Sequence, residues 1–348
     1  MPMITLDENI PYAAQAFSTL GQTQLLAGRG MSNADLQDTD ILVVRSVTKV
    51  NSQLLAGTPV RFVASATIGF DHVDLDYLRE QGIGFARAPG CNAVSAAEYV
   101  LTALCYWSLL RNKPLQECSI GIIGHGNVGS RVRRLCESMG MQCVVNDPPL
   151  QAQGGTGLFP LEAALACDIV TLHVPFTRTG EHHTYRLLDA RQLARLRPGT
   201  LLLNTARGGV VEESALLARL QAHADLDVVL DTWENEPDIN REMLQHTLLG
   251  TPHIAGYSLD GKIRGTEMVY QACCQFLHTQ ATWHSPLDPP TPLSNSQDKR
   301  RDVLNAYDIC ADDARLKVLL ADKALETRIY FDQLRKHYPV RREFSGLA

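Results

Sequence analysis

The sequence predicts an α/β protein built on doubly wound parallel sheets, and three observations carry that prediction. Short apolar runs of strand character alternate with helix-like segments from Ile4 to His278, the pattern of parallel sheets with helices on their faces. One such run, Ser119–Ile123, leads directly into three glycines and a helix-like segment. The proline-rich stretch Ser285–Pro292 then sets the last part of the chain apart as a linker and a short α-rich C-terminal extension.

The glycine-rich turn after Ser119–Ile123 is the most informative element of the chain. Three glycines have the G-x-G-x-x-G spacing, in which the first permits a tight turn, the second lets a pyrophosphate approach and the third lets the helix pack closely on the strand. The N–H groups at the helix start then face the phosphates. An ordinary turn would also explain the glycines, but the helix and second strand that follow favour a Rossmann-type dinucleotide site. Its candidate residues are Gly124, Gly126, Asn127, Val128 and Gly129.

The second strand, Gln142–Asn146, ends at Asp147, about twenty residues past the glycines. An acid at this distance is suited to bind a ribose 2′-hydroxyl. A carboxylate would repel a 2′-phosphate, and Pro148 and Pro149 follow it where an arginine would favour that phosphate. The sequence therefore predicts NAD as the cofactor in preference to NADP. If the glycines formed only an ordinary turn, the position of an acid at Asp147 would be a coincidence.

Length and composition narrow the class of protein. The 348 residues are enough for two or three domains, and a net charge of −6 argues against binding to nucleic acid or to a membrane surface. The nine cysteines lack C-x-x-C and metal-type spacing, so we expect reduced thiols, no metal and a cytoplasmic protein. The acidic start of the chain and its apolar runs predict neither a signal peptide nor a membrane span.

The first part of the chain predicts a small parallel sheet whose strands end in polar residues. Ligands of such sheets bind at the carboxyl ends of the strands, so the polar residues there are candidates for a substrate pocket. They are Arg45, Ser46, Thr48 and Thr67. The expected strands are Ile4–Leu6, Asp40–Ser46, Phe62–Thr67 and Ile83–Ala86.

A long apolar helix, Ala93–Leu110, is expected to lead from the first domain into the second, and a helix over Ser258–His278 to cross back. The substrate domain is then discontinuous. We expect it to comprise residues 1–93 and 257–284, with a nucleotide-binding domain over 94–256 and a linker and C-terminal dimerisation segment over 285–348. Further strands of the second domain are expected at Cys167–His173, Gly199–Asn204 and Asp227–Asp231.

Three residues at the ends of second-domain elements predict the chemistry: Arg207, Glu236 and His253. A guanidinium is a bidentate partner for a carboxylate, and a histidine suits a proton that leaves together with a hydride. A carboxylate beside the histidine would orient its ring and stabilise its charged form. Any one of the three alone would more often be a surface residue or a helix cap. Together with NAD they predict the oxidation of a 2-hydroxy acid.

Other polar clusters are interpreted as structural. Asp71-His72-Val73-Asp74 contains metal-ligand residue types, but it is assigned to turn and helix-start chemistry because no third ligand is evident. The positive charges of the tail are more ambiguous. They are either a solvated helix end, or they supply a phosphate site with Arg342 near the mouth of the active site. We expect a homodimer whose tail docks on or near the substrate domain, that of the same chain or of the partner.

The order and spacing of four motifs resemble the D-2-hydroxyacid dehydrogenase family. The motifs are the glycine turn, Asn204-x-x-Arg207-Gly208, Glu236-Pro237 and Thr251-Pro252-His253. The resemblance covers nearly the whole chain and extends to one branch of the family, whose substrate is a small phosphorylated 2-hydroxy acid. The runs that match this branch are Asp7–Tyr12, Val44–Val50, Ala88–Ala93, His253–Tyr257, Leu334–Lys336 and Arg341–Phe344.

This resemblance implies a flavodoxin-like substrate domain and assigns roles to residues. It implies that Arg207 and Glu236 are catalytic and that His253 is the proton donor and acceptor. It implies that NAD is lined by Asp147, Val174, Asp231 and Gly256, and that Ser46, Thr67 and Tyr257 contact the substrate. Val174 stands where the family usually has a threonine, so a contact there must come from the backbone. The C-terminal segment is shorter than in fuller-length relatives, which bears on its expected role in dimerisation.

Two alternatives stay open at this stage. The substrate could be that of another branch, such as 3-phosphoglycerate, glyoxylate or hydroxypyruvate. The chain could also be an NAD-sensing binding protein, since corepressors resemble this family, and an intact Arg207, Glu236 and His253 set does not exclude that function.

Overall fold

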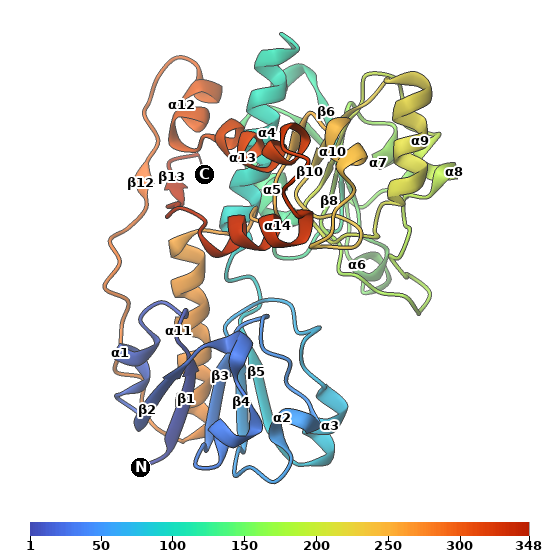
Figure 1. Ribbon diagram of the computed structural model, residues 1–348. Helices are drawn as coiled ribbons and strands as arrows, with labels where there is room; N and C mark the ends of the chain where they lie inside the picture. The colour runs from blue at the N-terminus through green and yellow to red at the C-terminus, as the bar shows by residue number, and fades with distance from the viewer. Residues whose placement is uncertain (348) are drawn as a thin grey trace. The chain divides into compact units, whose positions relative to one another are not determined.

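A computed structural model describes residues 1–347 and divides the chain into two compact units (Figure 1). The N-terminal unit comprises Met1–Asn92 and Tyr257–Pro290. The central unit comprises Ala93–Gly256 together with the residues from Thr291 onward, which we call the C-terminal segment. The N-terminal unit is therefore discontinuous, because the chain leaves it after Asn92 and returns to it at Tyr257.

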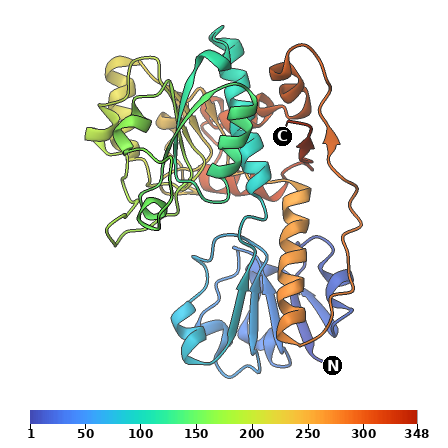
Figure 2. The same ribbon diagram turned by 180° about the vertical axis from the view of Figure 1, so that it is seen from behind.

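The N-terminal unit contains a five-stranded parallel sheet covered on both faces. Its strands are β1 (Met3–Asp7), β2 (Gln22–Leu26), β3 (Ile41–Val44), β4 (Phe62–Ser65) and β5 (Gly84–Arg87), in the order β2-β1-β3-β4-β5. Its helices are α1 (Ala13–Phe17), η1 (Gly28–Gly30), η2 (Asn33–Leu36), α2 (Ser52–Leu55), α3 (Leu75–Glu80) and α11 (Leu259–Phe276). Ile41 and Val43 join the hydrophobic cluster that includes residues of α1 and α11, whereas Leu42 and Val44 join a second cluster. This alternation places the two clusters on opposite faces, and Figure 2 shows α11 along one of them.

The central unit contains a six-stranded parallel sheet. Its strands are β6 (Ser119–Ile123), β7 (Gln142–Asn146), β8 (Ile169–Leu172), β9 (Leu201–Asn204), β10 (Asp227–Leu230) and β11 (Leu249–Gly250), in the order β11-β10-β9-β8-β6-β7. Its helices before the C-terminal segment are α4 (Ala93–Leu110), η3 (Leu115–Glu117), α5 (Gly129–Ser138), α6 (Pro148–Ala152), α7 (Leu161–Leu165), α8 (Ala190–Leu193), α9 (Glu213–His223) and α10 (Arg241–Gln245). Strand β6 lies between β7 and β8, so the loop that follows β6 is at the point where the strand order reverses. Dinucleotides bind at such points in doubly wound sheets, and the predicted fold class is confirmed.

Helix α4 is apolar along its whole length. By length and composition alone it could cross a membrane, so the expectation that no apolar run reaches that length was too strong. However, 78% of the helix is buried inside the structure. Its Trp107 indole N–H donates to Asp227 Oδ2 at 2.8 Å, which fixes the helix to the start of β10. Such burial is typical of the core helix of a globular protein.

The C-terminal segment is largely helical and packs on the central unit. It contains β12 (Thr291–Pro292), α12 (Lys299–Ala306), α13 (Ile309–Ala321), α14 (Thr327–Lys336) and β13 (Phe344–Ser345), and β12 pairs with β13 in parallel. Helix α12 packs on α4, and α13 packs on α10 and β11 (Figure 1). Leu316, Leu319 and Phe331 are fully buried in the main hydrophobic core of the central unit. Within this chain the segment therefore belongs to the central unit, whereas the sequence led us to expect docking on or near the substrate domain.

The predicted strands and long helices lie where the sequence places them, and several of the strands are shorter than predicted. The expected strands over 40–46, 62–67 and 167–173 are observed as β3, β4 and β8, each trimmed at its ends. Gly140 ends the helix region after α5 with φ 79°, as expected for a glycine cap. Elements that were not predicted include β2, β11, α13 and the short pair β12 and β13.

Candidate active site

The glycine turn is shaped by two close backbone approaches and one open position. Gly124 has φ 92°, and a Cβ atom there would lie 2.6 Å from the backbone oxygen of His173. A Cβ atom at Gly129 would overlap the backbone oxygen of Gly124. At Gly126, by contrast, a Cβ atom would meet nothing within 4 Å. The packing therefore requires the first and third glycines, whereas the second keeps the backbone open, as a pyrophosphate site needs.

Asp147 links the glycine turn to the second strand. Its Oδ2 accepts a hydrogen bond from the His125 N–H at 2.7 Å, and its Oδ1 accepts from the Leu150 N–H at 2.9 Å, which caps α6. The Gly124 N–H donates to the Asn146 oxygen at 2.8 Å in the same place. Asp147 thus lies beside the turn, where the predicted ribose contact requires it, and it also has a structural task. The donor set of this loop fits a dinucleotide.

His253 and Glu236 form the central pair of the candidate site. His253 Nδ1 lies 2.7 Å from Glu236 Oε2, and Glu236 Oε1 accepts from the Trp233 N–H at 2.7 Å. Burial alone would raise the pKa of Glu236, but His253, the Trp233 N–H and Arg335 together hold that pKa below its ordinary value. Glu236 is therefore a carboxylate at neutral pH. This pairing orients the imidazole ring and leaves Nε2 as the nitrogen for proton exchange.

Arg207 lies on the loop after β9, next to the loop that carries Glu236. Its Nη1 donates to the Ala206 oxygen at 2.8 Å, and its own backbone oxygen accepts from Asn204 Nδ2 at 3.0 Å. The Asp231 N–H donates to the Asn204 oxygen at 3.0 Å, which joins the ends of β9 and β10. The loops that carry Arg207 and Glu236 therefore follow neighbouring strands of one sheet edge.

Asp231 is fully buried and anchors the loop of His253. Its carboxylate accepts from Thr251 Oγ1 at 2.7 Å, from the Ile254 N–H at 2.7 Å and from the Ala255 N–H at 3.0 Å. Burial raises the pKa of Asp231, against the lowering effect of His253 and these donors. The loop ends at Gly256, the last residue of this part of the central unit. The expected NAD contacts of Asp231 and Gly256 remain predictions.

Val174 follows β8, and its Cγ1 atom lies 3.0 Å from the position that a Cβ atom would take at Gly124. Val174, from which we expect only a backbone contact with NAD, thus lies directly against the glycine turn. Its contact with NAD remains a prediction.

In the N-terminal unit, several predicted pocket residues are engaged in local contacts. Arg45 Nε pairs with the buried Asp7 at 3.0 Å, and Thr48 Oγ1 donates to the Gly28 oxygen at 2.9 Å. Thr67 Oγ1 lies 2.8 Å from Ser65 Oγ and donates to the Gly69 oxygen at 3.2 Å. Arg45 and Thr48 are therefore held by structural partners.

His72 and Asp74, which the sequence assigned to turn chemistry, have structural contacts. His72 Nε2 lies 3.1 Å from Ser65 Oγ, and burial lowers the pKa of His72. Asp74 Oδ1 accepts from the Tyr77 N–H at 3.0 Å and caps α3. Of the remaining substrate candidates, Ser46 follows β3, and the Tyr257 ring lies 4.8 Å from Lys262 Nζ.

Glu213 is a buried carboxylate near the site that the sequence did not single out. It accepts a short hydrogen bond from the Glu234 N–H and so holds the loop that carries Glu236. Burial raises the pKa of Glu213 to about 7, and the charges of Glu234 and Glu236 act in the same direction. In the sequence it resembles any acidic residue in the first turn of a helix, and only its burial distinguishes it.

Comparisons with known proteins agree over the whole chain. Residues 102–255 match the family described as "D-isomer specific 2-hydroxyacid dehydrogenase, NAD binding domain", and residues 291–348 match a domain of unknown function, DUF3410. The erythronate-4-phosphate dehydrogenase of Marinobacter nauticus is 46% identical over 99% of this chain and 94% of its own length. That of Cronobacter sakazakii is 44% identical over 99% and 93%.

Solved structures agree in fold. The D-lactate dehydrogenase of Aquifex aeolicus, complexed with NAD and lactic acid, has a TM-score of 0.64 at 24% identity, over 79% of this chain and 95% of that one. The NAD⁺-bound 3-phosphoglycerate dehydrogenase of Entamoeba histolytica has a TM-score of 0.65 at 22% identity, over 82% and 99%.

Proposed function

Because this chain belongs to the erythronate-4-phosphate dehydrogenase family of D-isomer-specific 2-hydroxyacid dehydrogenases, we propose that it oxidises 4-phospho-D-erythronate to 2-oxo-3-hydroxy-4-phosphobutanoate with NAD. This step belongs to pyridoxal phosphate biosynthesis. The observation that carries the proposal is the contact of 2.7 Å between His253 Nδ1 and Glu236 Oε2, in the unit that also holds the glycine turn. It gives a proton acceptor with a fixed orientation in the same unit as the proposed nucleotide site.

The residues of the central unit divide the work of this reaction. The N–H groups of the glycine turn and Asp147 would hold NAD, which supplies the acceptor for the hydride that leaves C2. Arg207 binds the carboxylate of the substrate and orients C2. His253 Nε2 takes the proton of the C2 hydroxyl, and Glu236 stabilises the imidazolium that results.

The N-terminal unit contributes recognition in this proposal. Ser46 and Tyr257 would offer hydroxyl groups to the polar end of the substrate, and Thr67, whose hydroxyl already donates to the Gly69 oxygen, would contact it as an acceptor. Hydroxyls suit this task because they donate and accept, and a substrate hydroxyl needs both. A homodimer in the cytoplasm completes the proposal, with the C-terminal segment as the expected contact between subunits.

A comparison of four substrates tests the proposal by following NADH absorbance. 4-Phospho-D-erythronate should give a kcat/KM on the order of a hundredfold or more above that of D-erythronate, because the analogue leaves a polar site unpaired. 3-Phosphoglycerate and glyoxylate, the latter assayed in the direction of reduction, represent the other branches of the family. A higher kcat/KM with either of them would transfer the chain to that branch.

The NAD-sensing alternative is tested in the same series. Binding of NAD without turnover of any of the four substrates would favour a sensing protein over an enzyme. A His253→Ala variant serves as the background rate, since it lacks the proposed base while retaining the glycine turn.

A further inference from the structure

The loop that carries His253 begins at the edge of the central sheet. Strand β11 has only two residues, Leu249 and Gly250, and it pairs with β10 on one side. An edge strand leaves backbone groups on its other side to be satisfied elsewhere. His253 follows this strand by three residues and has φ 55°, an uncommon backbone conformation for a side chain of its size. Such a conformation persists only where the surroundings determine it.

The buried carboxylate of Asp231, described above, holds the loop from the inner side. It accepts from three donors on residues 251–255, and the His253 N–H donates to the Asp231 backbone oxygen at 2.8 Å. These bonds use N–H groups of the loop and the Thr251 hydroxyl. Among the loop carbonyls, that of Thr251 accepts from the Trp233 indole N–H at 2.9 Å, and the carbonyl of Ala255 needs a donor from another direction.

Helix α13 of the C-terminal segment supplies contacts on the outer side. Asp313 Oδ1 accepts from the Gly250 N–H at 2.7 Å, and so satisfies a donor of the edge strand. Lys317 Nζ donates to the Thr247 oxygen at 3.1 Å and to the Leu248 oxygen at 3.2 Å. Asp313 and Lys317 are themselves paired at 3.0 Å. Residues 247–250, which lead into the loop of His253, are thus hydrogen-bonded to a helix more than sixty residues further along the chain.

Arg341 supplies a donor to Ala255, two residues after the histidine. Its guanidinium is buried, and Nη2 donates to the Ala255 oxygen at 2.7 Å and to the Ser95 oxygen at 3.0 Å. Its Cζ atom lies 4.4 Å from the centre of the Tyr307 ring, which favours a cation. Burial alone would lower the pKa of Arg341, but Tyr307, Tyr338 and Glu98 raise it, so the guanidinium is charged.

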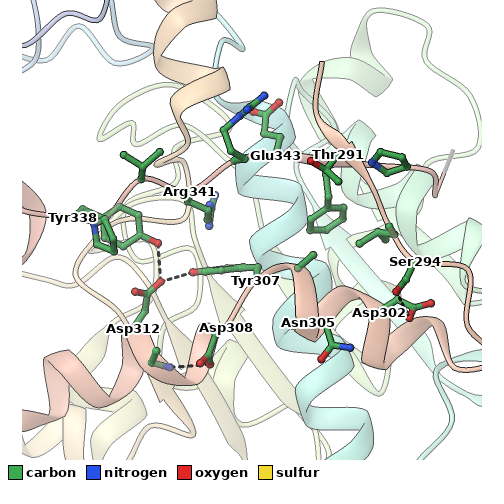
Figure 3. Close-up of a pocket in the computed structure, with 18 of the residues that line it drawn as sticks. Thr291, Ser294, Asp302, Asn305, Tyr307, Asp308, Asp312, Tyr338, Arg341 and Glu343 are labelled. Carbon is green, nitrogen blue, oxygen red and sulfur yellow. Dashed lines mark hydrogen bonds between the residues drawn. The ribbon is translucent and has the colours of Figure 1, made fainter. Parts of the chain in front are cut away.

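The position of Arg341 is itself fixed by the C-terminal segment. Tyr307 and Tyr338 both donate to the buried Asp312 Oδ2, at 2.8 Å and 2.7 Å (Figure 3). The Phe344 N–H donates to Glu98 Oε1 at 2.9 Å, which ties the chain after Arg341 to α4. Arg341 is therefore held from two sides: the Tyr307, Tyr338 and Asp312 cluster lies before it, and the bond from Phe344 to Glu98 lies after it.

We propose that the C-terminal segment is an intrachain brace of the loop that carries His253, residues 251–256. Within it, Arg341 is a positioning residue that fixes Ala255 and thereby keeps His253 aligned with Glu236. The proposal rests on the proposed function for the role of His253. It assigns a task within a single chain to a segment that matches a domain of unknown function. A charged donor makes the bond to Ala255 one of the stronger class, and its loss leaves two buried carbonyls without that donor.

The test compares Arg341→Met with Arg328→Met in the full-length protein. Arg328 is an exposed arginine of the same segment, so both variants lose one positive charge and only one loses the brace. We expect kcat to fall roughly tenfold or more in Arg341→Met, because small displacements of a catalytic group are costly. The affinity for NAD should stay within about twofold of the wild type, because the glycine turn is remote from the brace in sequence and is held by its own contacts. Arg341→Lys should restore part of kcat, since an ammonium can still donate to a carbonyl.

Amide hydrogen exchange provides the readout that does not depend on turnover. Amides of residues 247–256 should exchange faster in Arg341→Met than in Arg328→Met, while those of β6 and β7 stay unchanged. Equal exchange at 247–256 in the two variants, or equal kcat, overturns the proposal. If Arg341→Met does not fold, Lys317→Met takes its place, with the same expected direction and the same overturning result. An absence of turnover in the wild type would contradict the proposed function and would leave the exchange result to decide the brace.

Discussion

In the N-terminal unit the charged side chain at the end of β3 is already paired, because Arg45 lies 3.0 Å from the buried Asp7. In the central unit, the corresponding sheet edge carries a histidine paired with a carboxylate, His253 and Glu236 at 2.7 Å. The first pair joins a guanidinium to a carboxylate, whereas the second contains an imidazole, the side chain suited to general acid–base chemistry. The edges of two similar sheets therefore carry different pairs: an ion pair in the N-terminal unit, and a histidine with a carboxylate in the central unit. The difference agrees with the proposed function, in which the central unit performs the reaction and hydroxyls of the N-terminal unit bind the substrate.

The largest effect should come from removal of the exchangeable proton. His253→Ala should lower kcat on the order of a hundredfold or more, which is the usual loss of a general base. The affinity for NAD should hardly change, because the glycine turn has its own contacts. Steady-state kinetics and an NAD titration measure the two quantities, with His182→Ala in an exposed loop as the control. An equal kcat in the two variants would remove the central unit from its assigned role.

A second effect concerns stability in the central unit. The pKa of Glu213 is about 7 in the folded protein against an ordinary value of 4.5. As the pH rises through this window, the unfolded chain loses its proton first, so the folded state is destabilised by the group. Glu213→Gln stays neutral and should be more stable than the wild type at about pH 8 by on the order of 2 kcal/mol. The advantage should vanish well below the ordinary pKa of 4.5, where Glu213 is protonated in both the folded and the unfolded chain.

Urea denaturation of both proteins across this pH range measures the difference. A constant difference at all pH values would mean that Glu213 ionises normally in the folded protein.

The third effect tests whether the pair in the N-terminal unit is structural. Arg45→Met leaves the buried Asp7 carboxylate without its charged partner, with the contacts of Asn9 remaining, and should lower the free energy of unfolding by about 2 kcal/mol. The exposed Arg79, which pairs with the exposed Asp76, provides the control, and Arg79→Met should cost less than about 1 kcal/mol. A large rise in KM for Arg45→Met without loss of stability would instead give Arg45 a direct role in substrate binding.

The smallest effect is expected at the nucleotide site. Asp147→Asn keeps an oxygen for one of the two N–H groups and loses the charge, so NAD affinity should fall about fivefold. Binding of NADP should improve relative to NAD, because a neutral side chain no longer repels a 2′-phosphate. Titrations of both nucleotides measure this ratio. A wild-type preference for NADP would contradict the interpretation of Asp147.

The sequence predicts those features of the site that depend on neighbouring residues. The glycine turn, the strand before it and the acid after it lie within one stretch of about thirty residues, so spacing alone identifies them. Arg207, Glu236 and His253 could be placed at the ends of strands for the same reason. Short edge strands escape this approach, and β11 was missed because two residues carry no periodic pattern.

Features that depend on remote contacts could not be predicted. The role of Asp231 as an anchor requires knowledge of which N–H groups surround it, and its neighbours in sequence do not identify them. Arg341 appeared in the sequence as part of a basic tail. Its partners Ser95 and Ala255 lie 246 and 86 residues away, and no local pattern connects residues over such separations.

The covered edge of the central sheet also limits how this chain can be rearranged. A chain shortened before Thr291 would expose the Gly250 N–H and the core surface under Leu316, Leu319 and Phe331. Such an edge invites pairing with other chains, so the shortened protein would tend to aggregate before its activity could be measured. Exchange of this segment between relatives faces a related constraint. Residues 247–256 and the segment from Thr291 onward are hydrogen-bonded to each other. A functional exchange would therefore have to transfer both stretches together.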